Sequence, residues 1–160
     1  MAATPLAPCR GQQSPPAPIA IAVADFDYAD TSGEVRNQAA AHDARLRAFV
    51  GALRSALGQD ARYQVVALEC REPPCTAGRL AAGGELIERA RAAGAQLLLY
   101  GGIQKMSTLI SHGKVQVVDV AADTLLFDRL MSFRGDSDEA WEHALRFLVR
   151  DLMSANLPAQ

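Results

Sequence analysis

An arginine, two aspartates and a tryptophan gather in the run RGDSDEAW, from Arg134 to Trp141. Two strand-like segments lead into this run, and a strong helical pattern leads out of it. In open α/β sheets, ligands bind where strands end and helices begin. The spacing therefore predicts a site at this junction, with Arg134, Asp136, Asp138 and Trp141 as candidate residues.

Three further side chains are candidates because the expected topology brings them to the same edge. Lys105 and Ser107 follow an apolar segment that predicts a strand, and His42 lies on the inward edge of the first turns of a helix. Cations beside a helix N-terminus favour an anionic group, so Lys105 and Arg134 predict an anion site with Trp141 as its apolar wall. The opposing interpretation is structural: the arginine pairs with nearby aspartates, the tryptophan is core, the lysine is solvated and the histidine is a hydrogen-bonded structural residue.

A hydrolase-like enzyme is the alternative function. In that hypothesis His42 acts as the base, Asp25 or Asp138 orients it, and Ser107 is the nucleophile. The sequence contains no nucleophile elbow, phosphate loop or metal-ligand spacing to accompany these residues. We therefore expect a non-catalytic domain, with no cofactor and no metal.

The elements that must position these residues alternate between strand and helix at first. Three apolar runs are expected to be buried strands, at 18–26, 62–68 and 96–103. Two helical patterns connect them, at 37–58 and 76–93. The second helix either breaks at the paired glycines Gly83 and Gly84 or begins near Glu85. Right-handed crossovers then make the three strands parallel.

The pattern changes after residue 113. Strand patterns at 115–120 and 125–133 are separated by four residues, too few for a crossover helix, so an antiparallel hairpin is expected. A final helix, capped by Ser137 or Asp136, packs on the sheet. The prediction is a single α/β domain in the order β-α-β-α-β-β-β-α, with helices packed on a mixed five-stranded sheet. The domain is expected to span residues 18–155, between a flexible Pro/Ala-rich leader (1–17) and a loose tail (156–160).

Charge and hydropathy narrow the range of partners. The net charge is −2, and Lys105 and Lys114 are the only lysines, which argues against a nucleic-acid partner. No apolar run approaches the roughly 18 residues of a membrane span.

Three cysteines bear on the cellular compartment. Cys70 and Cys75 bracket a loop that contains two prolines, between an expected strand and an expected helix. Such a loop predicts a small disulfide ring of the kind found in exported proteins. The alternative is two unrelated thiols in a cytoplasmic loop. Cys9 is left unpaired in the leader.

Several segments together resemble a family of exported proteobacterial domains of unknown function. The segments that carry the resemblance are Ala22–Asp27, Asp30–Gly33, Gly94–Ile110, Val117–Val120 and Arg134–Trp141. Gly94–Ile110 corresponds to the family's "GAD-hydrophobic-G-x-V-x-K-x-S-x-L-I" stretch and Arg134–Trp141 to its later "RG-x-x-D-E-x-W". The whole resemblance covers roughly residues 19–153. Gln96 departs from the usual acidic residue, which puts a role for that position in doubt.

More distantly, the order of elements resembles the amino-terminal domain of the TolB translocation protein. It is also similar to the curli-secretion lipoprotein and to the lipoproteins that activate penicillin-binding proteins. These resemblances imply a periplasmic interaction domain without catalysis.

The combined expectation is a non-catalytic periplasmic binding or accessory domain. It would hold a small anionic ligand or a periplasmic partner protein at the C-terminal edge of its sheet. A purely structural interaction scaffold and a cytoplasmic location stay open, and the sequence does not indicate an oligomeric state.

Overall fold

The computed structural model describes residues 16–80, 84–155 and 157. Its elements follow one another in the order β1 (Ile19–Val23), β2 (Asp27–Asp30), α1 (Ala39–Gln59), β3 (Tyr63–Val66), α2 (Glu85–Ala92), β4 (Leu97–Lys105), β5 (Ile110–Asp119), β6 (Thr124–Arg134) and α3 (Asp138–Ser154). The expected single α/β domain with a mixed sheet is confirmed. Only residues 16 and 17 of the predicted leader are among the described residues. Cys9 lies outside them.

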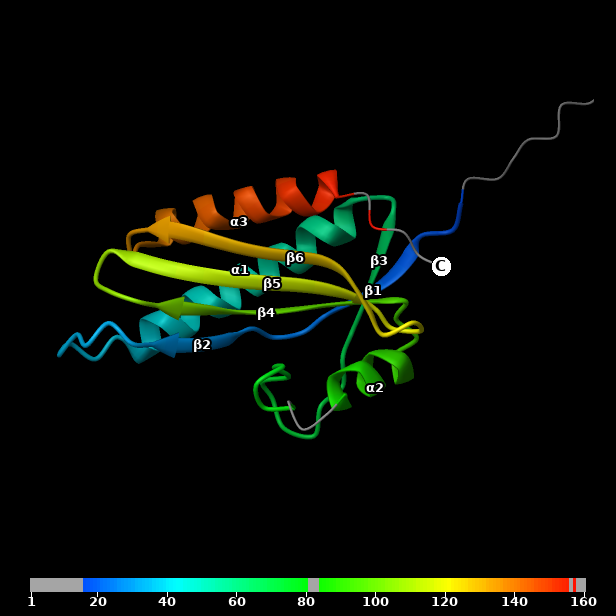
Figure 1. The fold of residues 1–160 in the computed structure, drawn as a ribbon, viewed down its shortest axis with the longest axis horizontal. Coiled ribbons are helices and arrows are strands. Elements are labelled where there is room, and N and C mark those ends of the chain that lie inside the picture. The colour runs from blue at the N-terminus through cyan, green and yellow to red at the C-terminus, as the bar shows by residue number, and fades with distance from the viewer. Residues whose placement is uncertain (1–15, 81–83, 156, 158–160) are drawn as a thin grey trace, which may run out of the picture.

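The sheet has the strand order β3-β1-β4-β5-β6. Strand β1 pairs in parallel with β3 and β4, while β4, β5 and β6 form an antiparallel meander. This topology is the one that the change from helical connections to a tight hairpin predicts. The strands β4 to β6 are long and extend well past β1 and β3 (Figure 1).

A sixth strand, β2, was missed by the sequence analysis. It pairs in parallel with the second half of β4, from Asp27 opposite Gly102 to Asp30 opposite Lys105. Its sequence, DYAD, begins and ends with aspartate, which has a low strand propensity. Pairing with β4 therefore decides its conformation, and this acidic segment, which lies between the predicted strand at 18–26 and the predicted helix at 37–58, runs along the sheet.

The helices cover the two faces of the sheet unequally. Helices α1 and α3 lie side by side on one face, where they bury the larger core, and α2 covers part of the other face with a smaller cluster (Figure 1). Helix α2 begins at Glu85, directly after Gly84 at a φ of 85°, which agrees with one of the two alternatives for this helix. Leu157, assigned to the loose tail by the sequence analysis, is 5% exposed and belongs to the larger core.

The β4–β5 hairpin is longer than predicted. Strand β4 continues to Lys105 and β5 already begins at Ile110, five residues before the predicted start. The polar sequence around this turn was interpreted as a loop. The segment is a strand because it pairs on both sides, with Gly113 opposite Ile103 of β4 and Met131 of β6. A Cβ at Gly113 would lie 2.5 Å from the Met131 Cε that packs over it. The glycine makes room for a core side chain rather than for a turn.

A candidate binding site at the loop end of the sheet

Three connections meet at one end of the molecule, which we call the loop end. They are the β2–α1 connection (31–38), the β4–β5 turn (106–109) and the β6–α3 connection (135–137), seen together at the left of Figure 1. The Thr31 N–H donates to the Lys105 carbonyl at 2.8 Å, and the Gly135 N–H donates to the Leu109 carbonyl at 2.9 Å. The backbone thus ties each outer connection to the central hairpin.

Lys105 is the buried charge at the base of the loop end. Its side chain is 1% exposed, and its Nζ donates to Glu34 Oε2 and to Asp136 Oδ2, each at 2.7 Å. Burial by itself would lower the pKa of Lys105, but the hydrogen bonds from its ammonium group to Asp136 and Glu34 raise that pKa above its ordinary value. The lysine is therefore charged, and it is not solvated as the structural interpretation of the sequence had it.

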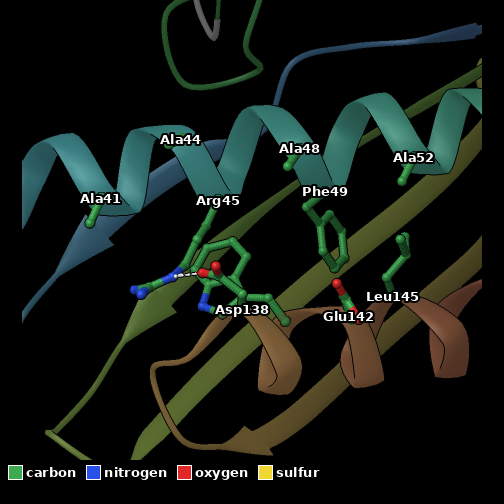
Figure 2. Close-up of a pocket in the computed structure, with 10 residues that line it drawn as sticks. Ala41, Ala44, Arg45, Ala48, Phe49, Ala52, Asp138, Glu142 and Leu145 are labelled. Carbon is green, nitrogen blue, oxygen red and sulfur yellow. Dashed lines mark hydrogen bonds and ion pairs between the residues drawn. The ribbon is translucent and has the colours of Figure 1, made fainter.

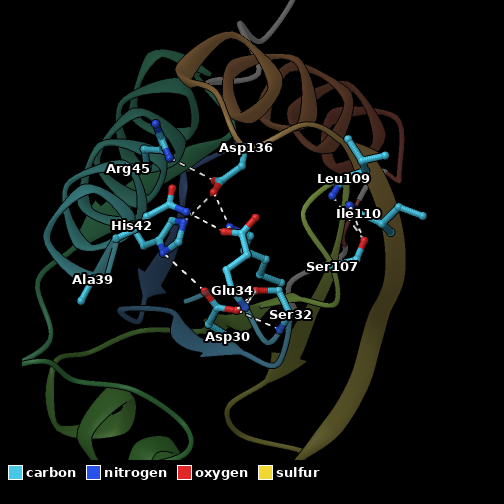
Figure 3. Close-up of polar contacts among 12 residues, drawn as sticks. Asp30, Ser32, Glu34, Ala39, His42, Arg45, Ser107, Leu109, Ile110 and Asp136 are labelled. Atoms are coloured by element: carbon cyan, nitrogen blue, oxygen red, sulfur yellow. Dashed lines mark hydrogen bonds and ion pairs between the residues drawn. The ribbon is translucent and has the colours of Figure 1, made fainter. Parts of the chain in front are cut away.

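Asp136 joins the lysine to two side chains of α1. His42 Nε2 lies 2.7 Å from Asp136 Oδ2, and Arg45 Nη1 donates to Oδ1 at 3.0 Å (Figure 3). Arg45 also donates through Nε to Asp138 Oδ1 at 2.7 Å. Burial would raise the pKa of Asp136, but hydrogen bonds from His42 and Lys105 outweigh burial and lower it to about 2. We call Glu34, His42, Arg45, Lys105 and Asp136 the ion network.

His42 lies next to three side chains, those of Asp136, Asp30 and Tyr28. An ionised Asp136 can only accept, so His42 Nε2 carries the proton of their hydrogen bond. His42 Nδ1 lies 3.9 Å from Asp30 Oδ2, and the Tyr28 ring centroid lies 5.0 Å from that of His42. Burial, followed by the negative charges of Asp30 and Asp136, raises the pKa of Tyr28 to about 12. His42 is thus a buried side chain that is hydrogen-bonded to Asp136, as the structural interpretation of the sequence expects.

Ser107 lies in the β4–β5 turn and serves the backbone there. Its Oγ accepts from the N–H groups of Leu109 and Ile110 at 3.3 and 3.2 Å. Figure 3 shows Ser107 apart from the His42 side chain, and no hydrogen bond among the described residues joins the two. This arrangement does not support the hydrolase-like alternative, in which His42 activates Ser107.

Arg134 does not join Lys105, and strand register explains why. Lys105 pairs with Ser111, and Ser111 pairs with Phe133, so these three residues share the sheet face covered by α1 and α3. Side chains alternate along a strand, which places Arg134 on the opposite face. Arg134 is exposed there, and no ion pair links it to another described residue. The two cations of the predicted anion site therefore do not converge.

Trp141 belongs to the core beneath the network. It is 3% exposed, and its ring makes edge-on contacts with Phe49 and Phe133 at centroid distances of 6.0 and 5.8 Å. Its outer edge contributes to a groove of about 580 Å³ between α1 and α3. Alanines line the α1 side of this groove and Leu145 lines the α3 side, with the Arg45–Asp138 ion pair at one end (Figure 2).

Two members of the ion network were missed by the sequence analysis. Arg45 stands three residues after His42 on α1, and this spacing places both side chains on one face of a helix, so a signal was present. Glu34 lies in an irregular connection, and its contact with Lys105 depends on the path of that connection. No periodic pattern in the sequence predicts the contact between Glu34 and Lys105.

The cysteine loop is a separate structural unit on the other side of the molecule. Cys70 and Cys75 form a disulfide, with their Cα atoms 5.7 Å apart. Asp25 accepts from the Cys75 N–H at 2.8 Å, and Asp27 accepts from the Gly78 N–H at 2.7 Å. The aspartates that leave the first strand therefore fix the loop to the sheet.

Two classes of feature are missing from the part of the chain that the structure describes. Within residues 16–80, 84–155 and 157, His, Cys, Asp and Glu side chains do not assemble into a group of three or more that could hold a metal ion. No helix in the same residues has the length and apolar character needed to cross a bilayer.

Comparison with known proteins gives a family and a fold. Residues 19–153 match the profile of the family DUF3280, described as "Protein of unknown function (DUF2380)". No curated protein matches the sequence. A family of unknown function, as the sequence led us to expect, is thus found, and its description names no ligand or activity.

The solved structures that are similar to this chain at low sequence identity include the PelC dodecamer, lipoprotein GNA1162 and TolB. The PelC dodecamer from Paraburkholderia phytofirmans has a TM-score of 0.53 at 14% identity, covering 92% of this chain and 96% of that one. Lipoprotein GNA1162 from Neisseria meningitidis has a TM-score of 0.51 at 14% identity, covering 88% and 100%. TolB from Acinetobacter baumannii has a TM-score of 0.52 at 14% identity, covering 88% of this chain and 29% of TolB. At these identities the similarity concerns the fold alone.

Proposed function

Because the chain belongs to the family DUF3280, whose description assigns no activity, we propose a function from its structure. The domain is a non-catalytic binding or accessory module of an exported, periplasmic protein, and it meets a macromolecular partner through the loop end. The disulfide supports export, because such bonds persist in oxidising compartments. The likeness to a protein named as a lipoprotein points the same way.

One observation carries the proposal: exposed aliphatic side chains lie on loops that buried ion pairs hold in place at their bases. Val35 is fully exposed, and Met106, Leu109 and Ile110 are 44%, 59% and 40% exposed. Exposed apolar side chains that cluster at one place mark interaction sites. Beneath them, Lys105 binds one carboxylate from each of the two outer connections, Glu34 and Asp136.

The ion network suits this role better than it suits a ligand pocket. Lys105 already binds two carboxylates, and Asp136 accepts from three cationic or imidazole donors. A buried ion pair contributes little net stability, since desolvation offsets its attraction, but it can fix a conformation. Loops that are already ordered lose less conformational entropy when they bind a partner. The ion network therefore orders the loops that form the binding surface. A small anion is the less favoured ligand, because the cations of the network are already paired.

Site-specific photo-cross-linking in the native bacterium tests the proposal. A photoreactive residue replaces Leu109 at the loop end or, as the control, Leu125, which lies next to the β5–β6 turn at the opposite end of the meander and is 49% exposed. We expect an intermolecular adduct from position 109, with protein or with lipid, and none from position 125. Equal adducts from both positions, or none from position 109, would contradict the assignment of the loop end as the binding surface.

A further inference from the structure

We propose that the groove between α1 and α3 binds a small neutral molecule with an aromatic body and a carbonyl oxygen, which accepts a hydrogen bond from the indole N–H of Trp141. This inference goes beyond the proposed function, because the groove is a second site, separate from the exposed aliphatic side chains of the loop end. Three observations carry it: the hollow between the two helices, a buried donor without an acceptor, and rim charges that are already paired.

The groove is hollow because the side chains of α1 that face α3 are short. Ala41, Ala44, Ala48 and Ala52 recur every three or four residues, so their methyl groups form one stripe along the helix. Figure 2 shows this stripe on one side of the groove and Leu145 of α3 on the other. The open volume of about 580 Å³ lies within the range of roughly 300–1,000 Å³ that is typical of small-molecule sites.

The groove carries a hydrogen-bond donor that no described residue accepts from. Trp141 lines the groove and is 3% exposed, and its Nε1 has no hydrogen-bond partner in the part of the chain that the structure describes. An indole nitrogen can only donate. A buried donor without an acceptor costs free energy, which an acceptor on a bound molecule recovers. The groove therefore favours a ligand that carries an acceptor.

Two aromatic rings favour an aromatic body for this ligand. Phe49 of α1 and Trp141 of α3 both line the groove, and they meet edge to face with their ring centroids 6.0 Å apart. A further ring can stack on them or meet them edge to face, which adds to the free energy gained when its surface leaves water. An aromatic ketone or amide combines such a ring with the acceptor that Trp141 lacks.

The charges at the rim favour a neutral ligand. Arg45 is bonded to Asp136 and Asp138 at 3.0 and 2.7 Å, and Glu142 lies 3.9 Å from Arg146. Each charged side chain that lines the groove thus has a partner of opposite sign. An anion would compete with the carboxylates for Arg45, and a cation would compete with the arginines for the carboxylates. A neutral molecule leaves both pairs intact.

An extended peptide fits the groove less well than a small molecule. Both walls are helices, whose backbone groups are hydrogen-bonded along the helix. A peptide would bring one backbone donor and one acceptor per residue against side chains that are mostly apolar, and each group left unpaired there costs free energy. A ligand with one acceptor on an apolar body instead matches the one unpaired donor that Trp141 provides.

Proton–nitrogen NMR of the full chain, titrated with benzophenone, tests the inference. Trp141 is the only tryptophan, so its indole N–H gives a single side-chain signal. We expect saturable shifts of this signal and of the Ala44 and Ala48 amide signals. Diphenylmethane, which has the same rings without the carbonyl, should bind about tenfold more weakly because it leaves the indole donor unpaired. Diphenylacetate, whose carboxylate meets Asp138 and Glu142, should also bind more weakly than benzophenone.

Two variants separate the hydrogen bond from the groove itself. Trp141→Phe keeps an aromatic ring in the core and removes the donor, so benzophenone and diphenylmethane should bind this variant equally. Ala48→Leu fills the groove from an exposed position and should abolish the binding of both, which keeps the test decisive should Trp141→Phe not fold. The control Ala39→Leu changes an exposed alanine of α1 outside the groove and should bind as the wild type does. Thermal melting of each variant checks the fold.

No saturable binding of benzophenone, or equal affinities of benzophenone and diphenylmethane for the wild type, would overturn the inference. Binding that persists in Ala48→Leu, or tighter binding of diphenylacetate, would do the same. If a second copy of the chain covers the groove instead, light scattering should find a dimer for the wild type and a monomer for Ala48→Leu, and that result would also refute the small-molecule site. Cross-linking from position 109 tests the proposed function separately, because Leu109 does not line the groove.

Discussion

Lys105 Nζ lies 2.7 Å from Asp136 Oδ2, although 31 residues separate them in the chain. The lysine is 1% exposed at the end of β4, and the aspartate lies in the connection from β6 to α3. The pair closes the open end of the β4–β6 meander, and Glu34 and Arg45 attach the β2–α1 connection and α1 to it.

The first prediction concerns the stability of this pair. Lys105→Met should lower the free energy of unfolding by about 3–5 kcal/mol, because it leaves two carboxylates without their buried cation. Lys105→Met with Asp136→Leu should cost less than the sum of the single changes, as residues in one network are coupled. Urea denaturation measures all of these values.

An exposed ion pair provides the matched control. Lys114 and Asp128 pair across β5 and β6, and their side chains are 50% and 39% exposed. Lys114→Met should change the free energy of unfolding by no more than about 1 kcal/mol. Similar losses for Lys105→Met and Lys114→Met would show that burial does not govern the effect.

A second prediction concerns the free energy of unfolding at acidic pH. The pKa of Asp136 is about 2 in the folded chain against an ordinary value of 3.8, which corresponds to about 2 kcal/mol. Because the folded pKa is the lower one, this stability is present above about pH 4 and is lost as the pH falls toward 2.

The variant Asp136→Asn isolates this contribution. Its free energy of unfolding, measured by urea denaturation across this pH window, should depend less on pH than that of the wild type. Asp30, whose pKa is lowered by hydrogen bonds from Ser32, titrates in both proteins and does not affect the comparison. Parallel pH profiles for the two proteins would contradict the assignment.

The third prediction concerns the cysteine ring. The disulfide closes a short loop, so changing Cys70 and Cys75 to serine should lower the free energy of unfolding by about 2 kcal/mol in the chain-entropy account. The loss should be absent when wild type and variant are compared under reducing conditions. Mass spectrometry after alkylation of the oxidised protein should find neither thiol modified, and modification of both would disprove the bond.

The fold was predictable where pattern and chain length leave few choices. Apolar runs linked by helices require parallel strands, and a four-residue connection requires a hairpin, so the order of the main elements could be read from the sequence. Strand β2 could not, because two of its four residues are aspartates and only its pairing with β4 makes it a strand.

The sequence predicted where the candidate site lies, but not which side chains contact one another there. Strand directions correctly brought Lys105, Asp136 and His42 to one end of the sheet. The face on which Arg134 lies depends on the register between β5 and β6, and a shift of one residue would reverse it. Register is set by packing details such as Met131 over Gly113, which a single sequence does not display.

Hydrogen exchange of individual amides in the Lys105→Met protein tests most directly whether the ion network holds the loop end together. The Thr31 and Gly135 amides, which donate to Lys105 and Leu109, report on the loop end, while the Gln96 amide, which donates to Ala20, reports on the opposite end. Local opening speeds exchange only where the structure loosens. We predict that exchange at Thr31 and Gly135 accelerates at least about tenfold more than at Gln96, equivalent to about 1.4 kcal/mol of local stability. Equal acceleration at all three amides, or none at Thr31 and Gly135, would contradict the account.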